Sequence, residues 1–360
     1  MLDSLFDLGE RLPPPRRRSR LGRAWNALGR DLAVDLGTAN TLVFDRGHGV
    51  VLDQPSFAAI DVETGRFLAI GAEAKEMLGR APEPIEVIRP LRSGVIGDFE
   101  AAQFLLREFL LRVHHRRRFV RPRVIVCVPS GVTQVERRAV EEAAFEAGAR
   151  RVAIVSEPLA AAVGAGLPVE AARGSMVVDI GGGTTDVAVF VLGGTVANAN
   201  APVGGDALDQ AVLAFCRKEL GIAIGERAAE RLKIVGGAAA PGVRNTLVEF
   251  LGRDAATGRP RTVRVHSDAL AEGMAEPVGT IVDTAISVFE RMPAEIVPDI
   301  AVRGITLTGG GALLAGLAVR MQREAGIPVH VDPEPLSCVV RGAGALLDRL
   351  PGGMGRRGME

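Results

Sequence analysis

Two short segments of this chain share one pattern. Residues 32–44 read LAVDLGTANTLVF, and residues 176–190 read MVVDIGGGTTDVAVF. In each, an apolar strand leads into an aspartate (Asp35 or Asp179, 144 residues apart), a glycine-containing turn and a second apolar strand. Glycine suits such a turn because it tolerates positive φ and has no side chain to hold a ligand away. One such turn is usually structural, but the duplication predicts two related hairpins that serve one site.

The rest of the chain fits around this repeat. From Asp31 to about Leu350, short β-branched strands alternate with Ala-rich helical stretches, which predicts an α/β fold. A length of 360 residues is enough for two domains. With 43 basic and 43 acidic residues the net charge is zero, which argues against general nucleic-acid binding.

Other sequence features suggest where the protein resides. No apolar run reaches the length of about 18 residues that a membrane-spanning helix needs. The N-terminus has no long apolar core of a secretory signal, so we expect a cytoplasmic protein. Cys127, Cys216 and Cys338 are far apart in apolar runs, which predicts core packing and neither a disulfide framework nor a metal site.

The two turns suggest phosphate chemistry. Backbone N–H groups of a turn bind an anion, and a carboxylate binds a hydrated cation, so two such turns can hold a triphosphate with its Mg²⁺. The chain has no GxxxxGK[ST] loop and no GxGxxG that opens a helix, which excludes a Walker-type loop and disfavours a dinucleotide fold. A third cluster, GITLTGGGALL (304–314), predicts a strand, three glycines and a helix from about Ala312. Its bare backbone could support a flat ring.

Together these motifs resemble a known superfamily. DLGTAN (35–40), DIGGGTTD (179–186) and LTGGGA (307–312) are similar to the two phosphate motifs and the adenosine motif of the actin-like ATPases, which include actin, heat-shock chaperone ATPases and sugar kinases. Longer segments, among them VVLDQPS (50–56) and IRPLRSGVIGDF (88–99), resemble the MreB family of bacterial actins. The resemblance runs from Asp31 to about Leu347, in family order.

The resemblance implies a domain organisation. We expect an actin-like ATPase fold of two lobes, each with a central sheet and flanking helices, and ATP in the cleft between them. The expected parts are a basic amphipathic leader (1–30), a first lobe (31–171, small subdomain about 59–91, with a returning segment at about 339–350), a second lobe (172–338, small subdomain about 208–269) and a disordered tail (351–360).

The resemblance also implies a set of binding residues. Thr38, Ala39 and Asn40 would line the first phosphate turn, and Gly181, Gly182, Gly183 and Thr184 the second. Asp35 and Asp179 would hold Mg²⁺ through water. Ala229, Glu230, Arg231, Leu232 and Lys233 would contact ribose and adenine, and Gly310, Gly311, Ala312 and Leu313 would back the adenosine. Taken alone, Glu230 and Lys233 are an i, i+3 pair that is usually a solvated ion pair on a helix.

Hydrolysis needs a carboxylate that orients a water in line with the γ-phosphate. We expect Glu157 to serve, because Ser156-Glu157-Pro158 follows a strand and precedes an Ala-rich helix. The MreB pattern has two glutamates before this proline, and Ser156 replaces the first, as in the chaperone ATPases. Glu136 is the alternative, but its helix has an apolar face and is expected to be structural.

Two basic segments suggest a membrane surface. Leu21, Trp25 and Leu28 share one face of a possible helix in the arginine-rich leader, which is typical of a segment that lies on an anionic bilayer. In HHRRRFVRPR (114–123), Phe119 and Val120 lie between arginines, at a position where the family inserts an apolar loop. The alternatives are a leader that is merely solvated, and nucleic-acid binding by the second segment.

We therefore expect an ATP- and Mg²⁺-dependent bacterial actin, a slow ATPase coupled to polymerisation. It would form polar or antiparallel protofilaments on the inner face of the cytoplasmic membrane and organise cell-wall elongation proteins to maintain rod shape. Nucleic acid is not an expected partner. The alternatives are a monomeric actin-fold kinase and a specialised organelle-positioning filament. The sequence leaves open filament polarity, ATP against GTP, and the identity of the protein partners.

Overall fold

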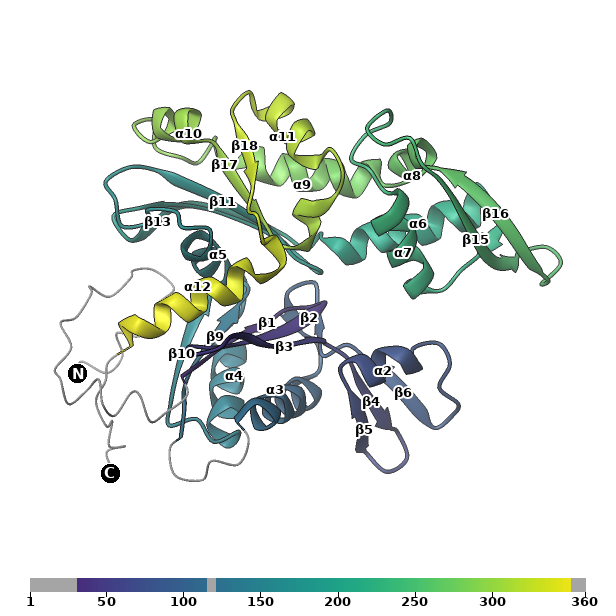
Figure 1. The fold of residues 1–360 in the computed structure, drawn as a ribbon, viewed down its shortest axis with the longest axis horizontal. Helices are drawn as coiled ribbons and strands as arrows, with labels where there is room; N and C mark the ends of the chain where they lie inside the picture. The colour runs from purple at the N-terminus through teal and green to yellow at the C-terminus, as the bar shows by residue number, and fades with distance from the viewer. Residues whose placement is uncertain (1–30, 115–120, 351–360) are drawn as a thin grey trace. The chain divides into compact units, whose positions relative to one another are not determined.

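The computed structural model describes residues 31–114 and 121–350 (Figure 1). These residues form two compact units. Unit 1 holds the described residues up to Arg173, Phe190–Thr195 and those from Ser337 onward, and unit 2 holds Gly174–Val189 and Val196–Leu336. The predicted leader, Phe119, Val120 and the predicted tail lie outside the described residues.

The main sheet of unit 1 contains the first predicted hairpin. Its strand order is β10 (Arg151–Ser156), β9 (Arg123–Val128), β1 (Leu32–Leu36), β2 (Asn40–Asp45) and β3 (Gly49–Pro55). Strands β10, β9 and β1 are parallel, while β2 and β3 are antiparallel to their neighbours. Every residue of β9 is buried, as expected for a parallel strand that is covered on both faces.

Helices cover both faces of this sheet (Figure 1). On one face lie α3 (Phe99–His114) and α4 (Gln134–Glu146), and on the other lie α5 (Glu157–Gly164) and α12 (Cys338–Leu346), which is followed by a 3₁₀ turn, η3 (Leu347–Arg349). The predicted apolar face of the helix after Glu136 is confirmed, because Val140, Ala143, Ala144 and Ala147 are buried. Cys127 and Cys338 are free and buried in this unit.

A smaller sheet extends unit 1. Its strands are β4 (Ala58–Asp61), β5 (Arg66–Ile70) and β6 (Ile85–Ile88), in the order β5-β4-β6, with α2 (Ala72–Met77) packed beside them. Phe57, Ala59 and Ala74 form its small core. A short hairpin of β7 (Leu91–Arg92) and β8 (Val95–Ile96) leads on to α3.

The main sheet of unit 2 contains the second predicted hairpin. Its strand order is β13 (Gly194–Ala201), β12 (Thr185–Val191), β11 (Ser175–Ile180), β17 (Ile305–Thr308) and β18 (Val329–Val331). The helices of this part are α6 (Gly205–Lys218), α9 (Ala275–Ser287), α10 (Val297–Arg303) and α11 (Leu317–Ala325). Cys216 is free and buried in α6.

The helix that we predicted from about Ala312 begins later. Gly310–Leu313 form a 3₁₀ turn, η1, and α11 begins only at Leu317. Gly316 at the helix start has φ 77°, a left-handed conformation that interrupts a continuous helix. The predicted helix start was therefore wrong by about one turn.

A second, smaller group of elements completes unit 2. It consists of β14 (Ile222–Ala223), β15 (Leu247–Asp254) and β16 (Pro260–His266) with α7 (Glu226–Gly236) and α8 (Ser267–Gly273); another 3₁₀ turn, η2 (Pro335–Ser337), follows β18. Helix α7 packs against α6. In the part of the chain that the structure describes, no helix combines the length and apolar character needed to cross a membrane.

Candidate functional site

The turn after β1 in unit 1 is fixed by the neighbouring strand. Ser56, which follows β3, donates from Oγ to the carbonyl of Gly37 at 2.6 Å and from its backbone N–H to the carbonyl of Ala39 at 2.9 Å. A Cβ at Gly37 would lie 2.7 Å from the carbonyl oxygen of Asn40, so only glycine fits there. Within this turn Thr38 is buried and Ala39 is exposed. The turn is therefore preorganised before any ligand arrives.

The turn after β11 in unit 2 is fixed by the start of α6. The N–H of Gly205 donates to the carbonyl of Gly181 at 3.0 Å, and the N–H of Asp206 donates to that of Gly182 at 2.7 Å. A Cβ at Gly204 would come within 2.6 Å of the Gly181 oxygen. Turn and helix thus meet backbone to backbone, so the position of α6 fixes that of the turn.

The carboxylate of Asp179 lies at the end of β11 and is buried. Thr308 Oγ1, on the adjacent parallel strand β17, donates to Asp179 Oδ1 at 2.8 Å. Burial raises the pKa of Asp179 to about 6; the Thr308 hydrogen bond opposes this rise, and the nearby carboxylate of Asp186 adds to it. A cation beside Asp179 would offset both burial and repulsion.

The carboxylate of Asp179 suits Mg²⁺, because this ion prefers oxygen ligands and commonly keeps several waters beside one or two carboxylates. Among the described residues no cluster of three or more His, Cys, Asp or Glu side chains forms a metal site. An ion held largely through water and phosphate needs no such cluster. The residues present therefore fit the Mg²⁺ that the sequence suggested.

The third glycine cluster packs against the same strand end. Gly309 has φ 78°, and a Cβ on it would lie 2.4 Å from the carbonyl oxygen of Ile180. A Cβ on Gly311 would lie 2.2 Å from the Ile180 side chain. These two glycines are thus required by packing on β11. Gly310 and Leu313 are exposed and Ala312 belongs to the core, so the exposed backbone at Gly310 is available for a flat ring.

Helix α7 presents a lysine toward α6. Lys233 Nζ lies 2.9 Å from Asp209 Oδ1 and donates to the carbonyl of Gly205 at 3.0 Å. Lys233 is thus held by α6, in contrast to the solvated ion pair that the i, i+3 spacing allows. Ala229 and Leu232 are in the core and Arg231 is exposed, while Glu230 is half-buried.

Glu157 lies at an edge of the unit 1 sheet. It is buried as the first residue of α5, directly after β10. Asp35 pairs in register with Cys127 of β9, and Cys127 pairs with Val155 of β10. Asp35 near the end of β1 and Glu157 just after β10 therefore lie at the carboxyl edge of the same parallel strands. Strand β9 lies between them, so strand spacing places them roughly 10 Å apart.

Glu136, the alternative carboxylate, caps α4. Its Oε2 accepts from the N–H and Oγ1 of Thr133, both at 2.7 Å, and its Oε1 accepts from the N–H of Ile96 at 3.3 Å. Burial works to raise its pKa, but these hydrogen bonds outweigh it and leave the pKa lowered. A capping box of this kind is a structural role.

The predicted residues therefore fall into two groups. Unit 1 brings together Asp35, Thr38, Ala39, Asn40 and Glu157 along one sheet edge. Unit 2 brings together Asp179, Gly181, Gly182, Gly183 and Thr184 with Gly310, Gly311, Ala312, Leu313 and the α7 residues Ala229, Glu230, Arg231, Leu232 and Lys233. Leu21, Trp25, Leu28, Phe119 and Val120 lie outside the described residues.

Sequence reasoning missed three residues that support these groups. Ser56 and Thr308 lie within the segments VVLDQPS and LTGGGA, so the resemblance contained the signal. Asp209 gave no such signal, because only the packing of α6 on α7 brings it to Lys233.

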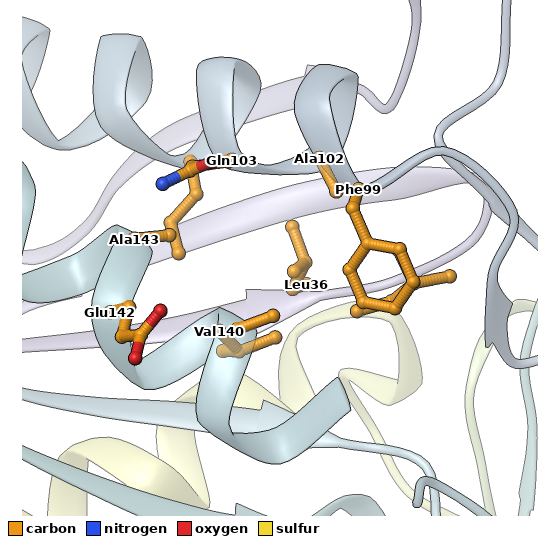
Figure 2. Close-up of a pocket in the computed structure, with 10 residues that line it drawn as sticks. Leu36, Phe99, Ala102, Gln103, Val140, Glu142 and Ala143 are labelled. Carbon is orange, nitrogen blue, oxygen red and sulfur yellow. The ribbon is translucent and has the colours of Figure 1, made fainter. Parts of the chain in front are cut away.

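A pocket elsewhere in unit 1 contains none of the predicted residues. Figure 2 shows it between α3 and α4, where Leu36, Phe99 and Val140 line it and Gln103 and Glu142 border it. Its volume is about 60 Å³. Pockets that take nucleotide-sized ligands measure roughly 300–1,000 Å³, so this gap is too small for one.

Comparison with known proteins decides the family. The family model described as MreB/Mbl protein matches residues 29–352. This chain belongs to the MreB/Mbl family. It is 48% identical to the cell shape-determining protein MreB of Escherichia coli strain K12 over 326 residues, 89% of this chain and 94% of that protein. It is 42% identical to the cell shape-determining protein Mbl of Bacillus subtilis strain 168 over 321 residues, 89% and 96% of the two chains.

Solved structures confirm the predicted actin-like fold. MreB5 of Spiroplasma citri, in crystal structures bound to AMPPNP and to ADP, matches with TM-score 0.83 and 34% identity over 88% of this chain and 95% of that one. The MamK double helical filament matches with TM-score 0.74 and 22% identity over 89% of this chain and all of that one, a likeness that shows the fold alone. The MreB-family resemblance inferred from the motifs is therefore confirmed.

Proposed function

We propose that this chain is an ATP-dependent, filament-forming bacterial actin that contributes to rod-shaped cell growth. The observation that carries the proposal is its likeness to MreB5 of Spiroplasma citri, which has been crystallised with AMPPNP and with ADP. The Escherichia coli and Bacillus subtilis relatives, named for cell-shape determination, support the cellular role.

The chain's own residues have defined tasks in this proposal. Backbone N–H groups of the turns 37–40 and 181–184 bind the phosphates. Asp35 and Asp179 hold Mg²⁺ through water, and Glu230, Lys233 and Gly310 support the nucleoside. Bound ATP with Mg²⁺ supplies the phosphoryl group whose hydrolysis drives filament turnover.

Hydrolysis depends on unit 1. Glu157 orients the attacking water and accepts its proton, a task for which its place directly after β10, at the carboxyl edge of the parallel strands, is suited. With Ser156 in place of the usual first glutamate, a single carboxylate performs this task, so we propose slow hydrolysis.

We also propose that filaments assemble on the inner face of the membrane and organise cell-wall elongation proteins there. An ion pair supports this: the guanidinium of Arg123 binds Asp31, with Nε donating to Oδ1 at 3.0 Å. Asp31 follows the leader and Arg123 ends the basic segment 114–123. Both segments therefore join the described chain at neighbouring points of one sheet.

The ion pair between Arg123 and Asp31 also corrects the expected extent of the basic segment 114–123. Arg123 is 1% exposed and also donates to the carbonyl of Leu350 at 3.0 Å, so it is structural and is not part of a basic surface. The basic segment that remains for the membrane is 114–121.

Sedimentation tests the proposed function. With ATP and Mg²⁺ the purified protein should form a polymer that pellets, and Asp179→Ala should abolish pelleting while circular dichroism shows an intact fold. Unchanged affinity of Asp179→Ala for ATP–Mg²⁺ in calorimetry would remove Asp179 from the site. Phosphotransfer to a small molecule without any polymer would instead support the kinase alternative.

A further inference from the structure

Asp209, a buried carboxylate on α6, forms an ion pair with Lys233 on α7. The ion-paired side chains of Asp209 and Lys233 are only 12% and 16% exposed. Asp209 lies one helical turn after Gly205, the α6 residue whose carbonyl accepts a hydrogen bond from the Lys233 ammonium. The ammonium is thus held at two points on one helix.

This arrangement limits what Lys233 can offer a ligand. An ammonium has three N–H donors. The Gly205 carbonyl accepts one of them, and the Asp209 carboxylate lies 2.9 Å from the nitrogen as its ion-pair partner. These two contacts restrict the directions in which the ammonium can donate to a ligand. The carboxylate therefore helps to orient the ammonium toward a ligand.

The same contact reaches the phosphate turn. Gly205, whose carbonyl binds Lys233, donates its own N–H to Gly181, and Asp206 donates to Gly182. A Cβ at Gly205 would lie 3.3 Å from Lys233 Nζ, so the lysine sits directly on the helix start. Through α6, the ion pair connects α7 to the turn 181–184.

Keeping the buried carboxylate of Asp209 ionised costs the folded protein free energy. Burial raises the pKa of Asp209 to about 6 in spite of Lys233, and Glu230 and Asp206 add to the rise. Of the described residues, no charged group on α8 or α9, which also pack against α6, acts on it. At neutral pH Asp209 is still ionised, but its ionisation costs the folded state free energy compared with the same carboxyl in water.

We infer that Asp209 is a positioning residue for nucleotide binding: it sets the Lys233 ammonium and couples α7 to the phosphate turn. This inference rests on the proposed function, because the ligand is the nucleotide that the two turns hold.

Binding of a fluorescent ATP analogue with Mg²⁺, measured from pH 7.5 to pH 5, tests the inference. The informative quantity is the ratio of the Kd of Asp209→Asn to that of the wild type, because titration of the nucleotide and of Asp179 affects both proteins and cancels. We expect a ratio of about ten at pH 7.5 that falls to about two at pH 5, where the wild-type carboxylate is itself protonated. Asp283→Asn, the same change at an exposed position on α9, should give a ratio of one throughout.

A double-mutant cycle tests whether Asp209 acts through Lys233. In a Lys233→Met background, Asp209→Asn should not change Kd further. A ratio of one at pH 7.5, or a ratio that stays at ten down to pH 5, would overturn the inference, the latter because it would indicate structural damage. Failure of the wild type to bind the analogue would instead overturn the proposed function.

The nucleotide-free protein gives an independent measurement. The chain has only three lysines, Lys75, Lys218 and Lys233, so NMR of ¹³C-labelled lysine yields three ε-methylene signals. In the wild type the Lys233 ε-methylene signal should titrate with a midpoint near pH 6, the pKa of Asp209. The other two signals serve as internal references. Absence of this titration would contradict the ion pair itself, with no ligand or variant involved.

Discussion

The buried carboxylate of Asp179 lowers the stability of the folded protein at neutral pH, so its presence there needs an explanation. Its pKa is raised to about 6 chiefly by burial, so ionisation at neutral pH costs the folded state free energy. A nonpolar or neutral side chain would avoid that cost. The carboxylate is explained if a cation binds there, and its neighbour Asp186 increases the need for one.

Replacing this carboxylate should therefore stabilise the metal-free protein. A folded-state pKa raised above the unfolded value contributes stability at low pH that is lost as pH rises through about 6. In EDTA at pH 7.5, Asp179→Asn should unfold with a free energy up to about 3 kcal/mol higher than the wild type, since one pKa unit corresponds to about 1.4 kcal/mol. Urea unfolding at pH 7.5 and pH 5 checks this, and the difference should shrink at pH 5. A variant that is less stable than the wild type at pH 7.5 would contradict it.

Glu157 and Glu136, the two candidates for the hydrolytic carboxylate, should differ in what their replacement changes. Glu157→Ala should still bind ATP and polymerise, but phosphate release should fall about a hundredfold, the typical loss for one positioned base. Glu136→Ala should leave release unchanged and lower the free energy of unfolding by about 1 kcal/mol, because it removes half of a capping box. A phosphate-release assay and thermal unfolding of both variants give the answer. The reverse pattern would exchange the two roles.

At the scale of elements, the sequence predicted the two hairpins but not what fixes them. The Asp-Gly turns and flanking strands were visible as local patterns. In unit 1 the turn is held by the hydrogen bond from Ser56 to Gly37, 19 residues away in sequence. In unit 2 it is held by the hydrogen bond from Gly205, at the start of α6, to Gly181, 24 residues away. Such contacts follow from packing, and no local periodicity encodes them.

The reason for some glycines was also hidden. The glycines 309–311 were predicted to offer bare backbone to a ligand; in addition, Gly309 and Gly311 are needed for close packing on Ile180. The late start of α11 has a different cause: Gly316 is left-handed, a backbone conformation that a helical sequence pattern does not show.

The close packing of helices α5 and α12 can be tested by substitution. In unit 1, α5 and α12 meet backbone to backbone: a Cβ at Gly342 would lie 1.8 Å from the carbonyl oxygen of Ala160. Gly342→Ala should therefore lower the free energy of unfolding by about 3 kcal/mol or more, because rigid backbone cannot move aside. Gly131→Ala is the matched control, since a Cβ there meets nothing within 4 Å. Thermal unfolding of both variants measures the effect, and equal midpoints would refute the close packing.

At the scale of the whole molecule, the repeat proved the most informative feature. It predicted two related hairpins, and both form in the main sheets of their units; the actin-like fold followed from the resemblance of these motifs to a known superfamily. The sequence could not tell that Asp31 and Arg123, 92 residues apart, form a buried ion pair, because Arg123 looked like one more charge in a basic run. That pair links the starting points of the two segments to which we assign membrane contact.

Membrane binding should depend on both of those segments together. The stripe of Leu21, Trp25 and Leu28 is too short to be helical alone in water, where helices below about 12 residues are marginal, so it should fold only at the bilayer. Phe119 and Val120 would add a second contact, and polymerisation would multiply both by avidity.

Co-sedimentation with anionic liposomes measures each contribution. Deleting residues 1–30 should weaken binding, and adding Phe119→Ser and Val120→Ser should nearly eliminate it. High salt should weaken binding of the intact protein, because charge attraction is screened. Polymerisation in solution should survive in every variant, since the proposed polymer contacts lie in the two units, and this serves as the control for folding. Full sedimentation of the truncated double variant with liposomes under non-polymerising conditions would show that neither segment is the anchor.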